Sequence, residues 1–236
     1  MAKRAPRTNQ ADFAFSCTRP PVKRVVRECF SGVARDAIGE LQPGAEIFGL
    51  TKGQFSLIDL VTELLRQTGP AHVTIATWTA AHSAIRSAFE FIRDGRILSL
   101  RWVVDRSFGS RQPEYCQALI ESFGPECIRI TRTHAKFVVI RNEEWDLAVR
   151  TSMNLNHNPR LEDFEISDDP VLADYLDSVT AEIFARQDVG EAMKRDTATV
   201  DRVFSEMNTG AEVPSARGGG DGFDLSDGDF SAGDLA

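Results

Sequence analysis

The stretch RTHAKFVVIRNEEWDLAVRTSMNL, residues 132–155, holds two apolar runs on either side of a short polar segment. Runs rich in β-branched and aromatic residues, bounded by polar turn residues, are typical of paired strands. We therefore predict an antiparallel hairpin with strands at about 134–140 and 145–152. Because this is the most apolar part of the chain, the hairpin is expected in the interior of a sheet.

Four polar side chains interrupt this apolar region. His134 and Lys136 lie two apart in the first run, and Ser152 and Asn154 lie two apart in the second. Residues i and i+2 of a strand point to the same face, so each pair is expected to project together. Burying polar groups is unfavourable unless they are hydrogen-bonded. We therefore interpret their placement at the ends of core strands as an anion-binding site.

The chemistry of these four residues suits a phosphodiester. Lys136 offers a point charge for a phosphoryl oxygen, and Ser152 and Asn154 offer hydrogen-bond donors of defined geometry. His134 can attack phosphorus as a nucleophile or protonate a leaving oxygen. A carboxylate on its second ring nitrogen would orient the ring, and Glu165 is the candidate for that role. A His-x-Lys pair alone is a weak signal, which Ser152 and Asn154 strengthen.

Outside the hairpin, strands and helices alternate. Strands are expected at 46–50, 72–78, 97–105, 127–131 and 162–167, and helices at 56–67, 82–93, 114–123, 169–187 and 190–206. Asp169 and Pro170 mark a helix start, and 107–113 is expected as a loop. This order predicts an α/β fold, a layered sandwich in which helices flank a mixed, mostly parallel sheet.

Charge divides the chain into three segments. Residues 1–40 are expected as a flexible basic arm with a short helix near 25–38, and residues 1–35 carry a net charge of +6. Residues 41–207 would form the catalytic domain. Residues 208–236 carry a net charge of −5 and are expected as a disordered acidic tail, because they contain too little apolar surface to fold alone. Each end either solubilises the protein or binds a partner. The basic arm would contact a polyanion, and the acidic tail would dock in a groove of another protein.

Composition excludes several classes of protein. The 236 residues carry a net charge of −8, and no run approaches the roughly 18 apolar residues of a membrane span. The start, MAKRAPRTNQ, lacks the apolar core of a secretory signal, so we expect a cytoplasmic protein. The four cysteines form no CxxC pair, so reduced thiols are favoured over disulfides or a metal site.

Three short motifs resemble the HKD signature of the phospholipase D superfamily over residues 45–187. They are His134-x-Lys136, Thr151-Ser152-x-Asn154 and Asp163-x-Glu165. The family pattern is His-x-Lys-x4-Asp, then Gly-Ser-x-Asn, then Asn-x-Glu. The resemblance implies a phospholipase D-like fold.

The chain departs from this pattern at three positions. Arg141 stands where the family has Asp, Thr151 where it has Gly, and Asp163 where it has Asn. The interval from Lys136 to Ser152 is also about three residues longer than usual, which a hairpin turn can absorb. Asp146, across that turn, is a candidate replacement for the missing carboxylate. These departures bear on activity more than on fold.

The resemblance implies a mechanism that needs neither metal nor cofactor. In the family one histidine forms a phosphohistidine, and a second histidine protonates the leaving group. This chain has one motif, so a homodimer sharing one site is implied. The basic arm favours DNA as the substrate over phospholipid. The alternative is a degenerate member that binds nucleic acid or a protein without cleavage, which Arg141, Thr151 and the tail favour.

Four further residues are candidate substrate contacts. Thr151 adjoins the motif serine. His157 and Arg160 follow Asn154 in a loop, where they either contact phosphates or are solvated. Trp78 ends a predicted strand and either stacks on a base or packs in the core.

Asp105 and Arg106, at the end of the strand 97–105, either line the groove or are solvated.

Overall fold

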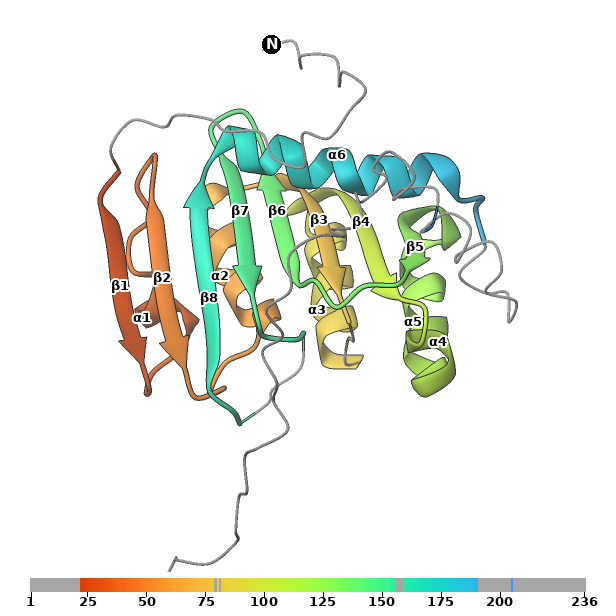
Figure 1. Ribbon diagram of the computed structural model, residues 1–236, viewed down its shortest axis with the longest axis horizontal. Helices are drawn as coiled ribbons and strands as arrows, with labels where there is room; N and C mark the ends of the chain where they lie inside the picture. Colours follow the sequence, from red (N-terminus) through yellow and green to blue (C-terminus); the bar gives the residue numbers. More distant parts are fainter. Residues whose placement is uncertain (1–21, 79, 81, 156–158, 191–204, 206–236) are drawn as a thin grey trace, which may run out of the picture.

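The computed structural model describes residues 22–78, 80, 82–155, 159–190 and 205. In this part of the chain, eight strands form one sheet in the order β1-β2-β8-β7-β6-β3-β4-β5 (Figure 1). The strands are β1 (Arg24–Cys29), β2 (Glu46–Thr51), β3 (Ala71–Thr77), β4 (Ile97–Asp105), β5 (Ile128–Thr131), β6 (Phe137–Arg141), β7 (Asp146–Thr151) and β8 (Glu162–Asp168). The helices are α1 (Ala34–Ile38), α2 (Leu57–Thr68), α3 (His82–Arg93), α4 (Phe108–Arg111), α5 (Pro113–Phe123) and α6 (Pro170–Arg186), with a 3-10 turn at Pro125–Cys127.

Helices cover both faces of the sheet, which confirms the predicted α/β layered fold. Helices α1, α2, α3 and α5 lie behind the sheet in Figure 1, and α6 crosses its near face. The larger core lies between the sheet and the helices behind it, and its members include Trp102 and Phe164, both 0% exposed. A smaller cluster of Ala76, Val103 and Ile183 lies beneath α6. No helix in the described residues is long and apolar enough to cross a membrane.

Local signals account for most of these elements. In α2, apolar residues recur at helical spacing and are buried, and the Asp59 carboxylate accepts from the Ser56 amide (2.7 Å) at its start. Helix α6 begins as predicted, because the Asp169 carboxylate accepts from the amides of Val171 (3.0 Å) and Leu172 (3.2 Å). Cys29, Cys116 and Cys127 carry free thiols, and burial raises the pKa of each.

The sheet is mixed, but it is not mostly parallel as predicted. Of the pairings in the described residues, β1–β2, β3–β4 and β4–β5 are parallel, and β2–β8, β8–β7, β7–β6 and β6–β3 are antiparallel. The short connections within β6–β7–β8 permit only antiparallel neighbours. This meander lies between β2 and β3, so the parallel strands are separated into two groups.

Part of the predicted N-terminal arm belongs to the sheet. Arg24–Cys29 form the edge strand β1, parallel to β2, with Val25 and Cys29 packed against the larger core. The short helix expected near 25–38 is confined to Ala34–Ile38. The loop predicted at 107–113 contains the four-residue helix α4. The tail 208–236 and nearly all of the helix predicted at 190–206 lie outside the described residues, and the domain boundaries stay predictions.

The hairpin is present but shorter than predicted. Strand β6 begins at Phe137 and β7 ends at Thr151, so the four polar residues flank the strands instead of lying within them. Before β6, the Thr133 hydroxyl accepts from the Ala135 amide (3.1 Å), and the Thr133 amide donates to the Asp105 carboxylate (3.1 Å). These two bonds, one local and one to the end of β4, replace strand pairing for the segment that carries His134.

Candidate active site

Four of the predicted site residues gather at one edge of the sheet, together with Glu162, which was not predicted. His134 and Lys136 precede β6, Ser152 and Asn154 follow β7, and Glu162 begins β8. Because β6, β7 and β8 alternate in direction, these strand ends meet at the same edge. The parallel strands β3, β4 and β5 end there too, and α/β proteins bind ligands beyond the carboxyl ends of such strands.

Thr151 joins the strand ends to one another. Its amide donates to the Lys136 carbonyl (3.2 Å), and its hydroxyl donates to the Asp163 carbonyl (2.5 Å) while accepting from the Met153 amide (2.9 Å). The Ser152 amide also donates to the Asp163 carbonyl (3.2 Å). The Thr151 hydroxyl therefore has a structural use, in addition to its predicted contact with substrate.

Lys136 and His134 lie side by side. The Lys136 Nζ is 3.4 Å from the His134 Nδ1 and donates to the His134 carbonyl (3.2 Å). Burial lowers the pKa of Lys136, and the Glu162 carboxylate partly opposes this shift. The His134 side chain is exposed, and the Trp78 ring lies against it with a centroid distance of 5.7 Å. The structure thus places the Trp78 ring beside His134, where it is only partly buried.

Glu162 is a site residue that the sequence reasoning missed. Its carboxylate accepts a hydrogen bond from the Ser152 hydroxyl, and the residue as a whole is only 9% exposed. The same hydroxyl accepts from the Asp163 amide (2.9 Å). Glu162 has the same parity as Phe164 and Ile166, which are both 0% exposed. A carboxylate in phase with buried apolar residues, at the first position of a strand, was the available signal.

Glu165 lies on the opposite face of β8. Its carboxylate pairs with the guanidinium groups of Arg150 and, at 3.3 Å, Arg24. Among the described residues, no hydrogen bond joins Glu165 to His134, so its predicted contact with the histidine ring is absent here. The two glutamates differ because positions 162 and 165 have opposite parity in an extended strand.

Asn154 contributes an amide whose oxygen atom is buried. Its backbone carbonyl accepts from the Leu57 amide (3.2 Å), and its Oδ1 is buried with no hydrogen-bond partner in the described residues. Leaving such a group unpaired costs about 1–3 kcal/mol. Turning the amide by 180° would place Nδ2 there, a donor that a phosphoryl oxygen can satisfy. Arg160 is exposed, and His157 lies outside the described residues.

Asp105, at the end of β4, holds the segment before His134. Its carboxylate accepts from the Thr133 amide (3.1 Å), the Ser107 amide (2.9 Å) and the Ser107 hydroxyl. The Arg106 amide donates to the Thr131 carbonyl (2.8 Å). Asp105 is therefore a positioning residue, because it fixes the backbone next to His134.

A hollow of about 590 Å³ opens beside Lys136 and Ser152. Helix α6 borders it with Tyr175, Leu176 and Val179. The other lining residues are Ala135, which precedes β6, and Phe137, Arg150, Thr151, Asp163 and Glu165 of the sheet. Lys136 and Ser152 thus adjoin a space large enough for part of a substrate, whereas His134 and Asn154 are not among the residues that line it. In the described residues, no group of three His, Cys, Asp or Glu is arranged to hold a metal ion.

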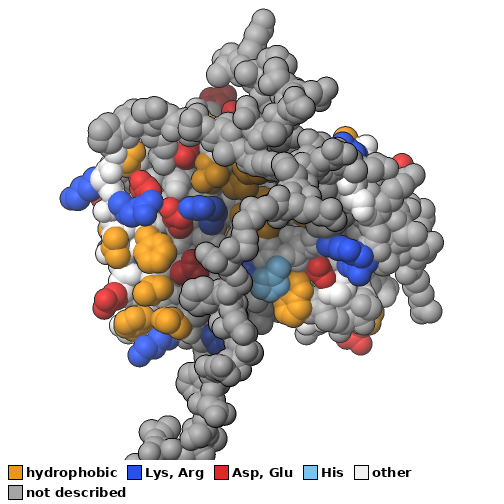
Figure 2. Space-filling view, in the orientation of Figure 1, with side chains coloured by type: hydrophobic (Ala, Val, Ile, Leu, Met, Phe, Trp, Pro, Cys, Tyr) orange, Lys and Arg blue, Asp and Glu red, His pale blue; other side chains and the backbone are white. Residues whose placement is uncertain are grey.

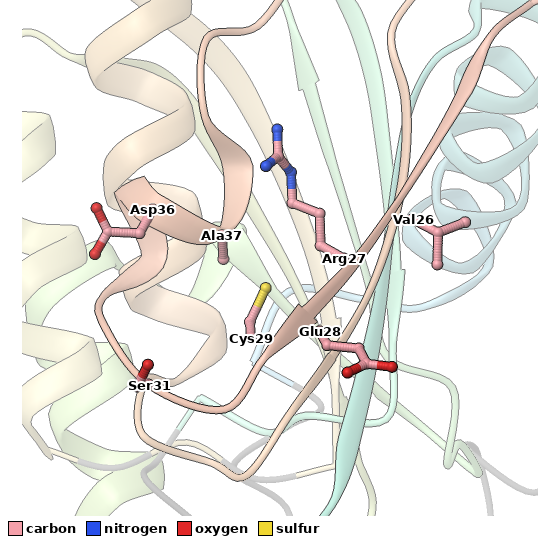
Figure 3. Close-up of a pocket in the computed structure, with 7 residues that line it drawn as sticks. All are labelled: Val26, Arg27, Glu28, Cys29, Ser31, Asp36 and Ala37. Carbon is pink, nitrogen blue, oxygen red and sulfur yellow. The ribbon is translucent and has the colours of Figure 1, made fainter.

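A second hollow, of about 320 Å³, lies at the edge strand (Figure 3). It is formed by β1 and α1 and includes Arg27, Cys29 and Asp36. The Arg27 Nε is buried without a hydrogen-bond partner in the described residues, and the Asp36 carboxylate accepts from the Val33 amide (3.1 Å). None of the predicted site residues contributes to this hollow, so it is separate from the candidate active site.

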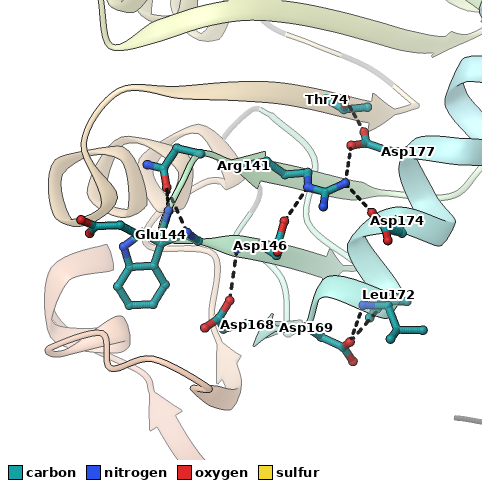
Figure 4. Close-up of polar contacts among 12 residues, drawn as sticks. Thr74, Arg141, Glu144, Asp146, Asp168, Asp169, Leu172, Asp174 and Asp177 are labelled. Carbon is teal, nitrogen blue, oxygen red and sulfur yellow. Dashed lines mark hydrogen bonds and ion pairs between the residues drawn. The ribbon is translucent and has the colours of Figure 1, made fainter. Parts of the chain in front are cut away.

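Arg141 lies at the end of β6 away from the site. It is five residues from Lys136, roughly 16 Å at about 3.3 Å per residue. Its guanidinium pairs with Asp146 (2.6 Å), Asp174 (2.7 Å) and Asp177 (3.4 Å), and Asp177 also accepts from the Thr74 hydroxyl (2.9 Å), as Figure 4 shows. Arg141 therefore fastens α6 to the sheet, and its position is remote from the candidate active site.

Replacing Arg141 by methionine is expected to destabilise the fold. Three carboxylates would lose their shared cation, so the free energy of unfolding should fall by about 2 kcal/mol. Denaturant unfolding measures this change. The control is Arg101→Met, an exposed arginine on β4, for which a change below about 0.5 kcal/mol is expected. Equal losses in the two variants would contradict a structural role for the Arg141 network.

Comparison with known proteins gives similarity at the level of solved structures. No protein-family model matches the sequence, and no curated protein matches it. A polyphosphate kinase from Porphyromonas gingivalis is 14% identical with a TM-score of 0.44, over 62% of this chain and 27% of that chain. Nuc from Salmonella typhimurium, a phospholipase D family member, is 13% identical with a TM-score of 0.44, over 59% and 93%. NucT from Helicobacter pylori is 15% identical with a TM-score of 0.42, over 59% and 96%.

Proposed function

We propose that this protein is a metal-independent phosphodiesterase that acts on DNA through a phosphohistidine. The observation that carries the proposal is the contiguity of four groups at one sheet edge: the His134 ring next to the Lys136 ammonium, and the Ser152 hydroxyl next to the Glu162 carboxylate. These groups supply a nucleophile, a cation, a hydroxyl and a carboxylate, side chains that can take part in displacement at phosphorus without a cofactor.

Each group has a distinct role in the proposed reaction. The His134 imidazole attacks phosphorus, forming an N–P bond while the P–O bond to the leaving alcohol breaks. Lys136 and Asn154 stabilise the negative charge on the phosphoryl oxygens. Glu162 holds the Ser152 hydroxyl and supports the charged form of Lys136. Water then attacks phosphorus, the N–P bond breaks, and the imidazole is regenerated.

The proposed reaction needs a second acid–base group, and we propose a second copy of the chain as its source. The leaving alkoxide takes a proton from the partner's His134, which later removes a proton from the attacking water. In the sequence His134 has a lysine two residues later, whereas His72, His82 and His157 do not. A two-fold axis beside the exposed His134 would bring two such rings to one phosphorus atom. Light scattering on the full chain measures whether two copies associate.

The direct test is hydrolysis of a phosphodiester in EDTA. Purified full-length protein should nick plasmid DNA and hydrolyse bis(4-nitrophenyl) phosphate with chelator present. Acid-labile phosphate should be trapped on His134 during turnover. Cleavage that occurs only with added Mg²⁺ would contradict the proposal. DNA binding without cleavage of either substrate would favour the alternative, a member that has lost catalysis.

The activity is expected to fall as the pH rises into the alkaline range. Lys136 must be protonated to stabilise the phosphoryl oxygens, and burial lowers its pKa, so its charge is lost at a lower pH than for an exposed lysine. Lys136→Arg should move this fall to higher pH, because guanidinium stays charged. The pH dependence of kcat/KM for bis(4-nitrophenyl) phosphate measures the shift. Identical alkaline profiles for the two proteins would assign the fall to another group.

A further inference from the structure

We propose that the hollow beside Lys136 and Ser152 binds one unpaired nucleobase next to the scissile phosphate, and that Asp163 recognises the hydrogen-bonding edge of that base. This inference rests on the proposed function and adds to it a substrate class, single-stranded nucleic acid, and a residue that selects among bases.

The size and lining of the hollow suit a nucleobase. Tyr175, Leu176 and Val179 of α6 form one side and Phe137 of β6 adjoins them, so an aromatic and apolar surface faces the space. Tyr175 is 40% exposed, which leaves ring surface available for stacking. At about 590 Å³, the hollow has room for one nucleoside. A base stacked in a duplex cannot enter it without leaving the helix, which favours single strands.

The opposite side of the hollow is charged. Arg150, Glu165 and Asp163 lie there on neighbouring strands β7 and β8. In the coloured part of this face, Figure 2 shows hydrophobic, basic and acidic side chains interspersed. A lipid acyl chain would desolvate these charges without returning hydrogen bonds, whereas a base presents polar edges to them. The lining therefore favours a nucleotide over a phospholipid tail.

Three carboxylates lie close together in β8, and Asp163 differs from the other two. Glu162 accepts from the Ser152 hydroxyl, and Glu165 is paired with Arg150 and Arg24. In the described residues, no hydrogen bond or ion pair engages the Asp163 carboxylate. Asp163 shares a face with Glu165 and lines the hollow. Its carboxylate is thus the acceptor that remains available to a ligand in this space.

The chemistry of a carboxylate predicts which base is preferred. An ionised carboxylate only accepts hydrogen bonds, from two oxygens side by side. Guanine presents two adjacent donors, N1–H and the N2 amino group. Thymine presents one N–H between two carbonyl oxygens, which the carboxylate would repel. Asp163 should therefore favour guanine over thymine at this subsite, by about tenfold for a two-bond contact.

The test measures binding, so that it does not depend on turnover. The full chain carrying His134→Ala is titrated against fluorescently labelled TTGTT and TTTTT at fixed salt, with anisotropy as the readout. We expect TTGTT to bind about tenfold more tightly. Adding Asp163→Asn should reduce this preference to about twofold, because an amide both donates and accepts. Adding Tyr175→Ala should weaken the binding of both oligonucleotides by a similar factor. The Tm of each variant shows whether it is folded.

Three results would overturn the inference: equal affinity for the two oligonucleotides, an unchanged preference in the Asp163→Asn protein, or a duplex of the same sequence binding as tightly as the single strand. Hydrolysis of bis(4-nitrophenyl) phosphate by the wild-type protein, which needs no base, tests the proposed reaction separately. A protein that discriminates guanine but does not hydrolyse this diester would support the base site and contradict the phosphodiesterase.

Discussion

His134→Ala is expected to lower the kcat for phosphodiester hydrolysis by about 10³-fold or more. The variant removes the nucleophile, and in the proposed dimer it removes the proton donor as well, because both come from the same position of two chains. The phosphohistidine should also disappear from acid-labile trapping experiments. Rapid-quench and steady-state kinetics on bis(4-nitrophenyl) phosphate in EDTA measure both effects.

Folding should be unaffected by this change. The His134 side chain is exposed and lies in a segment held by Asp105 and Thr133, so truncation leaves no cavity. His72→Ala is the matched control, because His72 is also exposed and its ring is bonded to Ser99 (2.7 Å) near the start of β3. A His72→Ala protein as inactive as His134→Ala would show that the loss is not specific to the site.

Glu162→Gln should lower kcat by about 10²-fold. The amide keeps the size of the side chain and still accepts from the Ser152 hydroxyl, but it lacks the charge that supports the ammonium of Lys136. Without that charge the pKa of Lys136 should fall further, so the alkaline loss of activity should also move to lower pH. The rate–pH profile therefore separates this electrostatic role from a general loss of structure.

The control for Glu162 is Glu165→Gln on the same strand. Glu165 pairs with arginines on the other face of β8. Glu165→Gln should therefore lower kcat by about tenfold at most, compared with about 10²-fold for Glu162→Gln. The two variants together test which carboxylate serves the site. If Glu165→Gln were the more damaging, the assignment of Glu162 would be wrong and the original expectation for Glu165 would stand.

Local sequence patterns predicted most of the elements correctly. Helices α2, α3 and α5 and strands β2, β3 and β4 fall within about two residues of the expected ranges, because apolar periodicity and capping residues act over a few neighbouring positions. The edge strand β1 was not predicted. Its six residues are extended through pairing with β2, some 20 residues further along the chain, and no local signal encodes such pairing.

The residues of the candidate site were likewise predictable from the sequence only in part. His134, Lys136, Ser152 and Asn154 could be recognised from the sequence, since polar residues at fixed spacing beside apolar strands are a local pattern. Asp105 lies 28 residues from Thr133 in the sequence. Its carboxylate reaches the Thr133 amide only because β4, which ends at Asp105, pairs with β5, which ends just before Thr133. Arg141 likewise has a clear role only once α6 lies across the sheet.

The sequence by itself determined the layered α/β class, the hairpin and the four polar residues, because these depend on periodicity and on neighbours within the chain. The tertiary structure decided the strand order, the place of Arg141 and the choice of Glu162 over Glu165 beside Ser152. The physical reason is that a strand turns alternate side chains to opposite faces. Which face of β8 points to the candidate site depends on the pairing of β8 with β2 and β7. That pairing joins β8 to segments that lie elsewhere in the chain.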